Sequence, residues 1–243
     1  MKTKYKHLLE DAKVVAVVAS VEDLRRGHLL PIPPHPNSEF IDMLELRLDK
    51  IPSADPNDTL VERLIHTKLP LIVTARDKSE RGGQKSWDIK IRRKLYRSFL
   101  PYATLIDIEA STVHGLLDVV KDAHDQGVGV IISYHNFDDL FADQLLDQGD
   151  ICLQVGGDVL KLAVKVRTSR ELCELQYIAA DIRRRCNFKV ATMAIGEPYG
   201  QISRYLDIIN GGPLIYGYLS GASVTGQPNA FQVKKFLATL QGR

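Results

Sequence analysis

Short apolar runs rich in β-branched residues recur along the chain. Eight of them lie at positions 14–18, 41–48, 71–74, 104–108, 128–133, 159–166, 190–195 and 214–219. Runs of this length predict β-strands. Because the runs are almost continuously apolar rather than strictly alternating, we expect each strand to be buried on both faces, as in a parallel sheet covered by helices.

Segments with helical periodicity separate these strands. They lie at positions 56–68, 87–102, 138–146, 169–185, 201–209 and 229–240. An alternation of strand and helix repeated about eight times predicts an α/β fold, a single-domain (β/α)8 TIM barrel over residues 1–243. A doubly wound sheet is the alternative, but the sequence lacks the glycine fingerprint of that fold. Four prolines between positions 26 and 40 predict an irregular loop in the first connection.

Charged residues gather at the ends of the predicted strands, where a barrel of this kind carries its catalytic groups. On the second strand, alternation puts Glu45, Arg47 and Asp49 on one face. Because burying them unpaired would cost several kcal/mol, they are expected to pair with one another or with a polar ligand. The third strand ends at Arg76, whose planar guanidinium suits a carboxylate or hydroxyls. For the charged residues of the second strand, the alternative is a structural ion pair inside the barrel. For Arg76 and the segment after it, the alternative is a plain surface loop.

The fifth and sixth strands carry groups suited to proton transfer and covalent chemistry. Of the seven histidines, only His135 lies where a strand leaves the barrel, and an imidazole can both take and return protons near neutral pH. The alternative is a half-buried, hydrogen-bonded histidine. Lys161 and Lys165 lie on the same face of the sixth strand. Burial and neighbouring cations would favour the neutral amine, which can attack a carbonyl and form an imine.

Polar groups also follow the last two strands. A glycine-containing turn at 196–200 leads into a helix that carries Arg204, a layout that can present backbone N–H groups to an anion. The loop after the eighth strand carries Ser223 and Gln227. Their hydrogen-bonding side chains predict a lid over a polar ligand.

Composition narrows the functional classes. The formal net charge is +2 with no block of basic residues, which argues against nucleic acid or an anionic membrane as a partner. No apolar run approaches the roughly 18 residues of a membrane span, and no secretory signal is evident, so we expect a cytoplasmic protein. Cys152, Cys173 and Cys186 show no metal-binding spacing and are expected to stay reduced.

The set of strand-end motifs resembles one family, type I 3-dehydroquinate dehydratase, the Schiff-base enzyme of the shikimate pathway. The resemblance covers nearly the whole chain. Its carriers are ELRLD at 45–49, TAR at 74–76 with Glu80 and the glycines at 82 and 83, DIE at 107–109, SYHNF at 133–137, KLA at 161–163, GQISR at 200–204 and SVTGQ at 223–227. Each motif is short, but their order and their positions at successive strand ends make the combination specific.

The resemblance implies a reaction and a role for each matching residue. The enzyme would dehydrate 3-dehydroquinate to 3-dehydroshikimate without a cofactor, in aromatic amino-acid biosynthesis. Lys161 would form an imine with the substrate ketone, and His135, oriented by Glu80, would act as general base and acid. Arg204 would bind the substrate carboxylate. The positions that match contacts to the ring hydroxyls and the carboxylate are Glu45, Arg47, Arg76, Ser223 and Gln227. By analogy with family members that dimerise, the resemblance also implies a homodimer.

The sequence departs from the family pattern in four places. Arg81 is inserted between Glu80 and the two glycines, and the turn at 196–200 is one residue longer than usual. Thr225 replaces a common proline, and the family's polar contact from the first strand has no match near 17–20.

Three other functions compete with this one. The first is another imine-forming lyase or aldolase on the same barrel, acting on a different keto sugar or keto acid. The second is a barrel that has lost catalysis and serves as a binding module. The third is a metal enzyme that gathers Asp107, Glu109 and His135, although no HxH or HExxH spacing supports it. We therefore expect no metal site.

Overall fold

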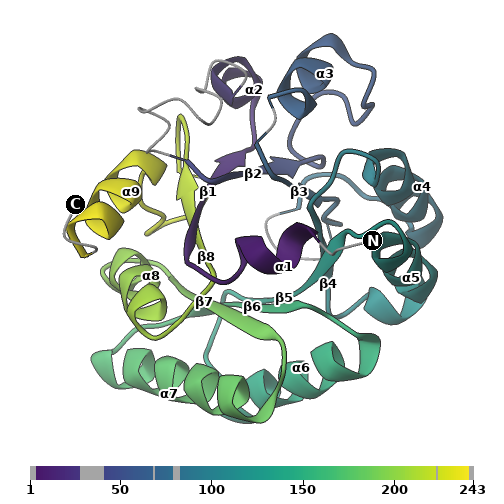
Figure 1. The fold of residues 1–243 in the computed structure, drawn as a ribbon. Helices are drawn as coiled ribbons and strands as arrows, with labels where there is room; N and C mark the ends of the chain where they lie inside the picture. The colour runs from purple at the N-terminus through teal and green to yellow at the C-terminus, as the bar shows by residue number, and fades with distance from the viewer. Residues whose placement is uncertain (1–3, 28–40, 68, 79–82, 223, 241–243) are drawn as a thin grey trace.

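Eight parallel strands form one sheet in the computed structural model, which describes residues 4–27, 41–67, 69–78, 83–222 and 224–240. The strands are β1 (Lys13–Val18), β2 (Met43–Arg47), β3 (Leu71–Thr74), β4 (Leu105–Glu109), β5 (Gly129–Asn136), β6 (Val159–Lys165), β7 (Lys189–Ile195) and β8 (Leu214–Tyr218). Their order is β7-β6-β5-β4-β3-β2-β1-β8, so the sheet curls into a nearly closed barrel with helices around it (Figure 1). Every predicted strand and the predicted barrel are confirmed.

Helices connect the strands and cover the barrel. They are α1 (Lys4–Leu8), α2 (Val21–Gly27), α3 (Thr59–Ile65), α4 (Ile89–Phe99), the 3-10 helix η1 (Val113–Leu116), α5 (Leu117–Asp125), α6 (Ala142–Val155), α7 (Ser169–Arg185), α8 (Tyr199–Ile209) and α9 (Ala230–Leu240). Within the described residues, no helix has the length and apolar character to cross a membrane. The organisation of residues 1–243 as one domain stays a prediction.

One predicted helix begins later than expected, and one predicted loop lies mostly outside the described residues. The helix expected at 138–146 was placed too early, because the Asn136 side chain accepts hydrogen bonds from the backbone N–H groups of Asp138 and Asp139 and holds a turn there. Helix α6 begins at Ala142 instead and ends at Gly156, which has a φ of 76°. Most of the proline-rich connection predicted as a loop, residues 28–40, lies outside the described residues.

Apolar side chains form two clusters, one on each side of the strand backbones. On β1, Val14, Ala16 and Val18 belong to the cluster that packs against the helices, whereas Val15 and Val17 belong to the cluster in the lumen. Strands buried on both faces read as continuous apolar runs, which is why the sequence predicted them so clearly.

The lumen changes character along the strands. Towards their amino ends, the inward residues are apolar, and on six of the eight strands the inward residue two positions further along carries a polar group. The pairs are Met43 and Glu45, Ile72 and Thr74, Leu105 and Asp107, Ile131 and Ser133, Val159 and Lys161, and Leu214 and Tyr216. The polar half of the lumen therefore lies towards the carboxyl ends of the strands, where barrel enzymes carry their active sites.

Helix α1 closes the apolar end of the barrel. It lies across the barrel axis (Figure 1), and the side chains of Tyr5 on the helix and of Leu9 just after it join the lumen cluster. The Tyr5 hydroxyl donates a hydrogen bond of 2.8 Å to Asp158 Oδ1. Gly129, at the start of β5, leaves room for the Tyr5 ring, since a Cβ there would lie 2.8 Å from it. The lumen is therefore closed at the amino ends of the strands and accessible from their carboxyl ends.

We expect Gly129→Ala to destabilise the protein. The added methyl group would lie 2.6 Å from Leu105 Cδ2 as well as against Tyr5, so the seal must shift. Overpacking of this kind costs about 1–3 kcal/mol of unfolding free energy, measured by urea denaturation. Gly221→Ala is the matched control, because nothing lies within 4 Å of its added Cβ. Equal stability of the two variants would contradict the tight seal.

Candidate active site

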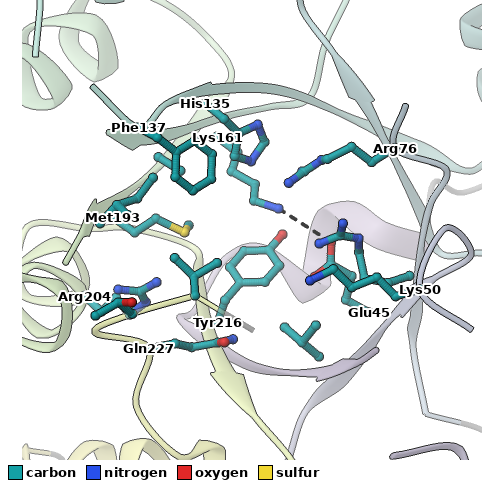
Figure 2. Close-up of a pocket in the computed structure, with 16 residues that line it drawn as sticks. Glu45, Lys50, Arg76, His135, Phe137, Lys161, Met193, Arg204, Tyr216 and Gln227 are labelled. Atoms are coloured by element: carbon teal, nitrogen blue, oxygen red, sulfur yellow. Dashed lines mark ion pairs between the residues drawn. The ribbon is translucent and has the colours of Figure 1, made fainter. Parts of the chain in front are cut away.

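A pocket of about 300 Å³ opens at the polar end of the barrel. Its lining residues come from several strands of the barrel and the residues just after them, from helix α8 and from the loop that follows β8 (Figure 2). Seven of the predicted site residues line it: Glu45, Arg47, Arg76, His135, Lys161, Arg204 and Gln227. The other two, Glu80 and Ser223, lie outside the described residues.

Lys161 lies at the centre of the site. Its side chain is buried on β6, and its Nζ donates a hydrogen bond of 2.8 Å to Asp107 Oδ2. The same Nζ lies 3.6 Å from Glu45 Oε1 and 4.1 Å from the centre of the Tyr216 ring. Two carboxylates and an aromatic face therefore hold the ammonium form of Lys161 in place.

This environment corrects one expectation. The sequence suggested that cations such as Arg47, Arg76 and Arg204 would surround Lys161, but its nearest charged neighbours are Asp107 and Glu45. The reason is that a buried ammonium without a partner would be far more costly than a paired one. The Lys161 amine therefore lies between two carboxylates rather than among cations.

Asp107 is the anchor of this pair. It is fully buried on β4, where its second oxygen, Oδ1, accepts a hydrogen bond of 2.6 Å from Ser133. Although burial alone would raise the pKa of the Asp107 carboxyl, the charges of Lys161 and Arg76 and these hydrogen bonds hold it below its usual value. Asp107 is therefore a carboxylate at neutral pH. The sequence analysis assigned it no role beyond the metal alternative.

His135 lies on β5, two residues beyond Ser133 and on the same face. Because Ser133 pairs with Lys161 and His135 pairs with Ala163, the imidazole lies one step nearer the mouth of the pocket than the lysine. Desolvation, and then the positive charges of Arg76, Lys161 and Arg47, put the pKa of His135 well below 6.5. Its Nδ1 has no hydrogen-bond partner among the described residues. At neutral pH, His135 is a neutral base.

The arginines on the second and third strands are held by buried carboxylates. Arg47 forms two hydrogen bonds with Asp49, of 2.7 and 2.9 Å, which confirms the predicted pairing on that face. Arg76 Nε lies 3.6 Å from Glu109 Oε1, and Glu109 also pairs with the buried Arg92. Within the described residues, Arg76 Nε and Nη2 have no hydrogen-bond acceptor. Arg76 thus offers donors to a ligand.

Arg204 is a buried cation of the pocket that forms no ion pair with a carboxylate of the described residues. It is buried on α8, and its Nη1 donates to the backbone carbonyls of Ala194, at 3.2 Å, and Gly226, at 3.4 Å. No described carboxylate forms an ion pair with it, and its Nε has no partner in the described part of the chain. Burial lowers the pKa of Arg204 to about 10, so it is still a cation at neutral pH. An anionic ligand would satisfy it.

Backbone N–H groups of the turn at 196–200 were expected to face an anion. The structure uses two of them internally, because Gly196 N–H donates to Thr225 and Gly200 N–H donates to Gly196. Gly200 packs so closely against Gly226 that a Cβ on Gly200 would lie 2.6 Å from Gly226 Cα. The turn therefore joins the two loops and positions Arg204.

Sequence reasoning missed several residues of the pocket wall. They are Val17, Lys50, Phe137, Ala163, Met193, Ile195, Tyr216, Val224 and Thr225. Period-two alternation from Glu45, His135 or Lys161 would have found some of them, since Phe137 and Ala163 share a face with those residues. Val17 is the contribution of the first strand, for which the resemblance offered no match.

The two carboxylates of the hypothetical metal site pair with cationic side chains of the protein. Asp107 holds Lys161, Glu109 holds Arg92, and no group of three side chains suited to a metal ion occurs in the described part of the chain. The carboxylates at the end of β4 therefore hold protein cations.

Comparisons with known proteins identify the family of this chain. Residues 35–243 match the family model for type I 3-dehydroquinase. A 3-dehydroquinate dehydratase of Methanosarcina barkeri is 31% identical over 214 residues, which cover 82% of this chain and 86% of that protein. A catabolic 3-dehydroquinate dehydratase of Acinetobacter baylyi is 29% identical over 214 residues, covering 82% and 76%.

A solved structure extends the agreement to the fold. The crystal structure of 3-dehydroquinate dehydratase from Geobacillus kaustophilus superimposes with a TM-score of 0.83 at 22% identity, and covers 96% of this chain and 92% of that one. From the family model and the sequence relatives, the chain belongs to the type I 3-dehydroquinase family.

Proposed function

We propose that this chain dehydrates 3-dehydroquinate to 3-dehydroshikimate through a covalent imine on Lys161. Dehydration of 3-dehydroquinate is the activity named for both sequence relatives. The observation that carries the mechanism is a buried lysine beside a neutral histidine, in a pocket whose Arg204 pairs with no described carboxylate. A keto acid suits this site, because its ketone can react with Lys161 and its carboxylate can bind Arg204.

Binding orients the substrate. The guanidinium of Arg204, which forms no ion pair with a carboxylate of the described residues, binds the substrate carboxylate. Arg76 offers Nε and Nη2 to the ring hydroxyls, while Glu45, Arg47 and Gln227 line the same pocket. The ketone then faces Lys161.

Imine formation uses the lysine amine. Lys161 gives up a proton, its nitrogen lone pair forms a bond to the ketone carbon, and the carbonyl oxygen leaves as water. The ammonium and the ketone thus yield an iminium ion and one water molecule. The iminium is an electron sink that acidifies the neighbouring C–H bond.

His135 completes the reaction. As a neutral base it removes the proton beside the iminium, and the electron pair moves to the nitrogen. The resulting enamine expels the ring hydroxyl, to which the protonated His135 returns the proton, so that water leaves. Hydrolysis of the iminium frees the product and Lys161. Glu80 orients the imidazole and Ser223 contacts the substrate in this proposal, by analogy with the family.

Several wider expectations stay predictions. They are the cytoplasmic location, the homodimer, the absence of a nucleic-acid partner and the absence of a cofactor. A small molecule is the substrate of the family, and the pocket volume of about 300 Å³ suits one.

Lys161→Ala should abolish the covalent step. We expect turnover to fall by about 10⁴-fold or more, because the variant lacks the amine that forms the imine in this proposal. Borohydride added with 3-dehydroquinate should leave a reduced adduct on the wild-type protein, which intact mass and peptide mapping assign to Lys161. The adduct should be absent from the variant. An adduct on Lys165 would contradict the assignment.

Arg204→Gln should weaken substrate binding. Losing a charge-assisted hydrogen bond to a carboxylate costs about 1.5–3 kcal/mol, so we expect KM to rise by about 10- to 100-fold. Steady-state kinetics measure the change. Arg170→Gln is the control, since Arg170 is exposed on α7. A KM unchanged in Arg204→Gln would show that the carboxylate binds elsewhere.

The acid limb of the pH profile should report His135. The base must be neutral, so kcat/KM falls as the pH drops through the pKa of His135 in the free enzyme. Because burial and nearby cations lower this pKa well below 6.5, activity should persist to a pH below 6.5. Arg76→Gln removes one of the cations and should move the midpoint up. A wild-type midpoint at or above 6.5 would contradict the environment described for His135.

A further inference from the structure

Tyr216 projects into the pocket from β8. Its side chain is 3% exposed, and it approaches Lys161 from the side of the lumen opposite His135 (Figure 2). The ring lies under the lysine ammonium, with Nζ 4.1 Å from the ring centre. Two different groups therefore flank the lysine, an imidazole on one side and a phenol on the other.

The hydroxyl of Tyr216 has no hydrogen-bond partner among the described residues. Other buried tyrosines of this chain are satisfied, since Tyr5 donates to Asp158 at 2.8 Å and Tyr96 donates to the Asp107 carbonyl at 2.6 Å. Buried phenol groups normally find a partner. An unsatisfied donor that lines a substrate pocket is suited to a group that arrives with the substrate.

The chemistry of this hydroxyl is that of a donor. Burial, together with the negative charges of Glu45 and Asp107, keeps the pKa of Tyr216 well above its usual value of 10. The group stays protonated at neutral pH and cannot act as a base. What it can offer is a hydrogen bond to an oxygen that gains negative charge.

Imine formation creates such an oxygen beside Lys161. When the lysine nitrogen bonds to the ketone carbon, the π electrons of the carbonyl move to the oxygen. The proton that leaves the nitrogen ends on this oxygen and gives a carbinolamine. The oxygen takes a second proton, the one that the lysine ammonium gave up before its attack, and departs as water while the nitrogen lone pair forms the iminium double bond. The same oxygen returns when the iminium is hydrolysed.

We propose that the Tyr216 hydroxyl donates a hydrogen bond to this oxygen during formation and hydrolysis of the imine. The proposal rests on the proposed function of Lys161. It divides the work between the two flanking groups: His135 moves the proton on carbon, and Tyr216 stabilises the charge on oxygen. The ring of Tyr216 also packs against the ammonium, but only the hydroxyl is needed for this step.

Tyr216→Phe tests the hydroxyl alone, because the ring and its contact with Lys161 remain. In rapid-quench experiments with 3-dehydroquinate and borohydride, we expect the adduct on Lys161 to appear about 10- to 100-fold more slowly than in the wild type. With substrate deuterated at the carbon that His135 deprotonates, the isotope effect on kcat/KM should shrink, since an earlier step becomes slower. The melting temperature should not fall, because no protein hydrogen bond is lost.

Tyr5→Phe is the matched control. Tyr5 is equally buried in the lumen cluster but donates to Asp158 at the sealed end of the barrel. Its loss should lower the melting temperature and leave the rate of adduct formation unchanged.

The outcomes separate the two proposals. An adduct that forms in Tyr216→Phe at the wild-type rate would overturn the role of the hydroxyl and leave the imine mechanism intact. A fall in melting temperature as large as that of Tyr5→Phe, with the wild-type rate, would assign the hydroxyl to stability instead. A wild-type enzyme that turns over substrate without any adduct would overturn the proposed function of Lys161 and this inference with it.

Discussion

The ion pair between Lys161 and Asp107 is the interaction on which the rest of the site depends. Neither group could be buried alone in a barrel lumen, because an unpaired charge there would cost several kcal/mol. Asp107 satisfies the lysine with one oxygen and Ser133 with the other, and Glu45 lies close enough to share the charge. The pair thus fixes the buried Lys161 amine, the nucleophile of the proposed mechanism, at one point in the lumen.

The barrel supports this pair because the apolar and the polar residues of the lumen lie at opposite ends of its axis. Apolar residues and helix α1 close the amino end of the lumen, so the polar groups face one mouth. Carboxylates such as Asp107 and Glu45 lie around the lysine, whereas Arg76 and Arg204 present unsatisfied donors to the pocket. In the proposed function, an anionic keto acid that enters this site would meet a guanidinium at the wall of the pocket and the Lys161 amine deeper in the lumen. Glu109 helps by neutralising Arg92 and Arg76 behind the pocket.

Much of this could be predicted from the sequence, because the signals were local. Strands such as Val159–Lys165 are continuous apolar runs, and Lys161 is conspicuous within one of them. Six helices were predicted from their periodicity, including the seven-residue α3, but α1, α2 and α5 were missed. Contacts across the barrel could not be predicted, since nothing near Asp107 in the sequence shows that it faces Lys161, 54 residues further on. Tyr216 was not predicted as a pocket residue for the same reason. In the sequence, a tyrosine within an apolar strand cannot be distinguished from a core residue.

The measurement that tests this account most directly is a carbon-13 NMR spectrum of the stalled enzyme. His135→Ala removes the base that follows imine formation, so the intermediate on Lys161 should accumulate. With 3-dehydroquinate labelled at the ketone carbon and the lysines labelled with nitrogen-15, the account predicts a bound carbon resonance in the imine region that couples to one lysine nitrogen. A bound substrate that shows only the ketone resonance, in a variant of an enzyme whose wild type is active, would contradict it.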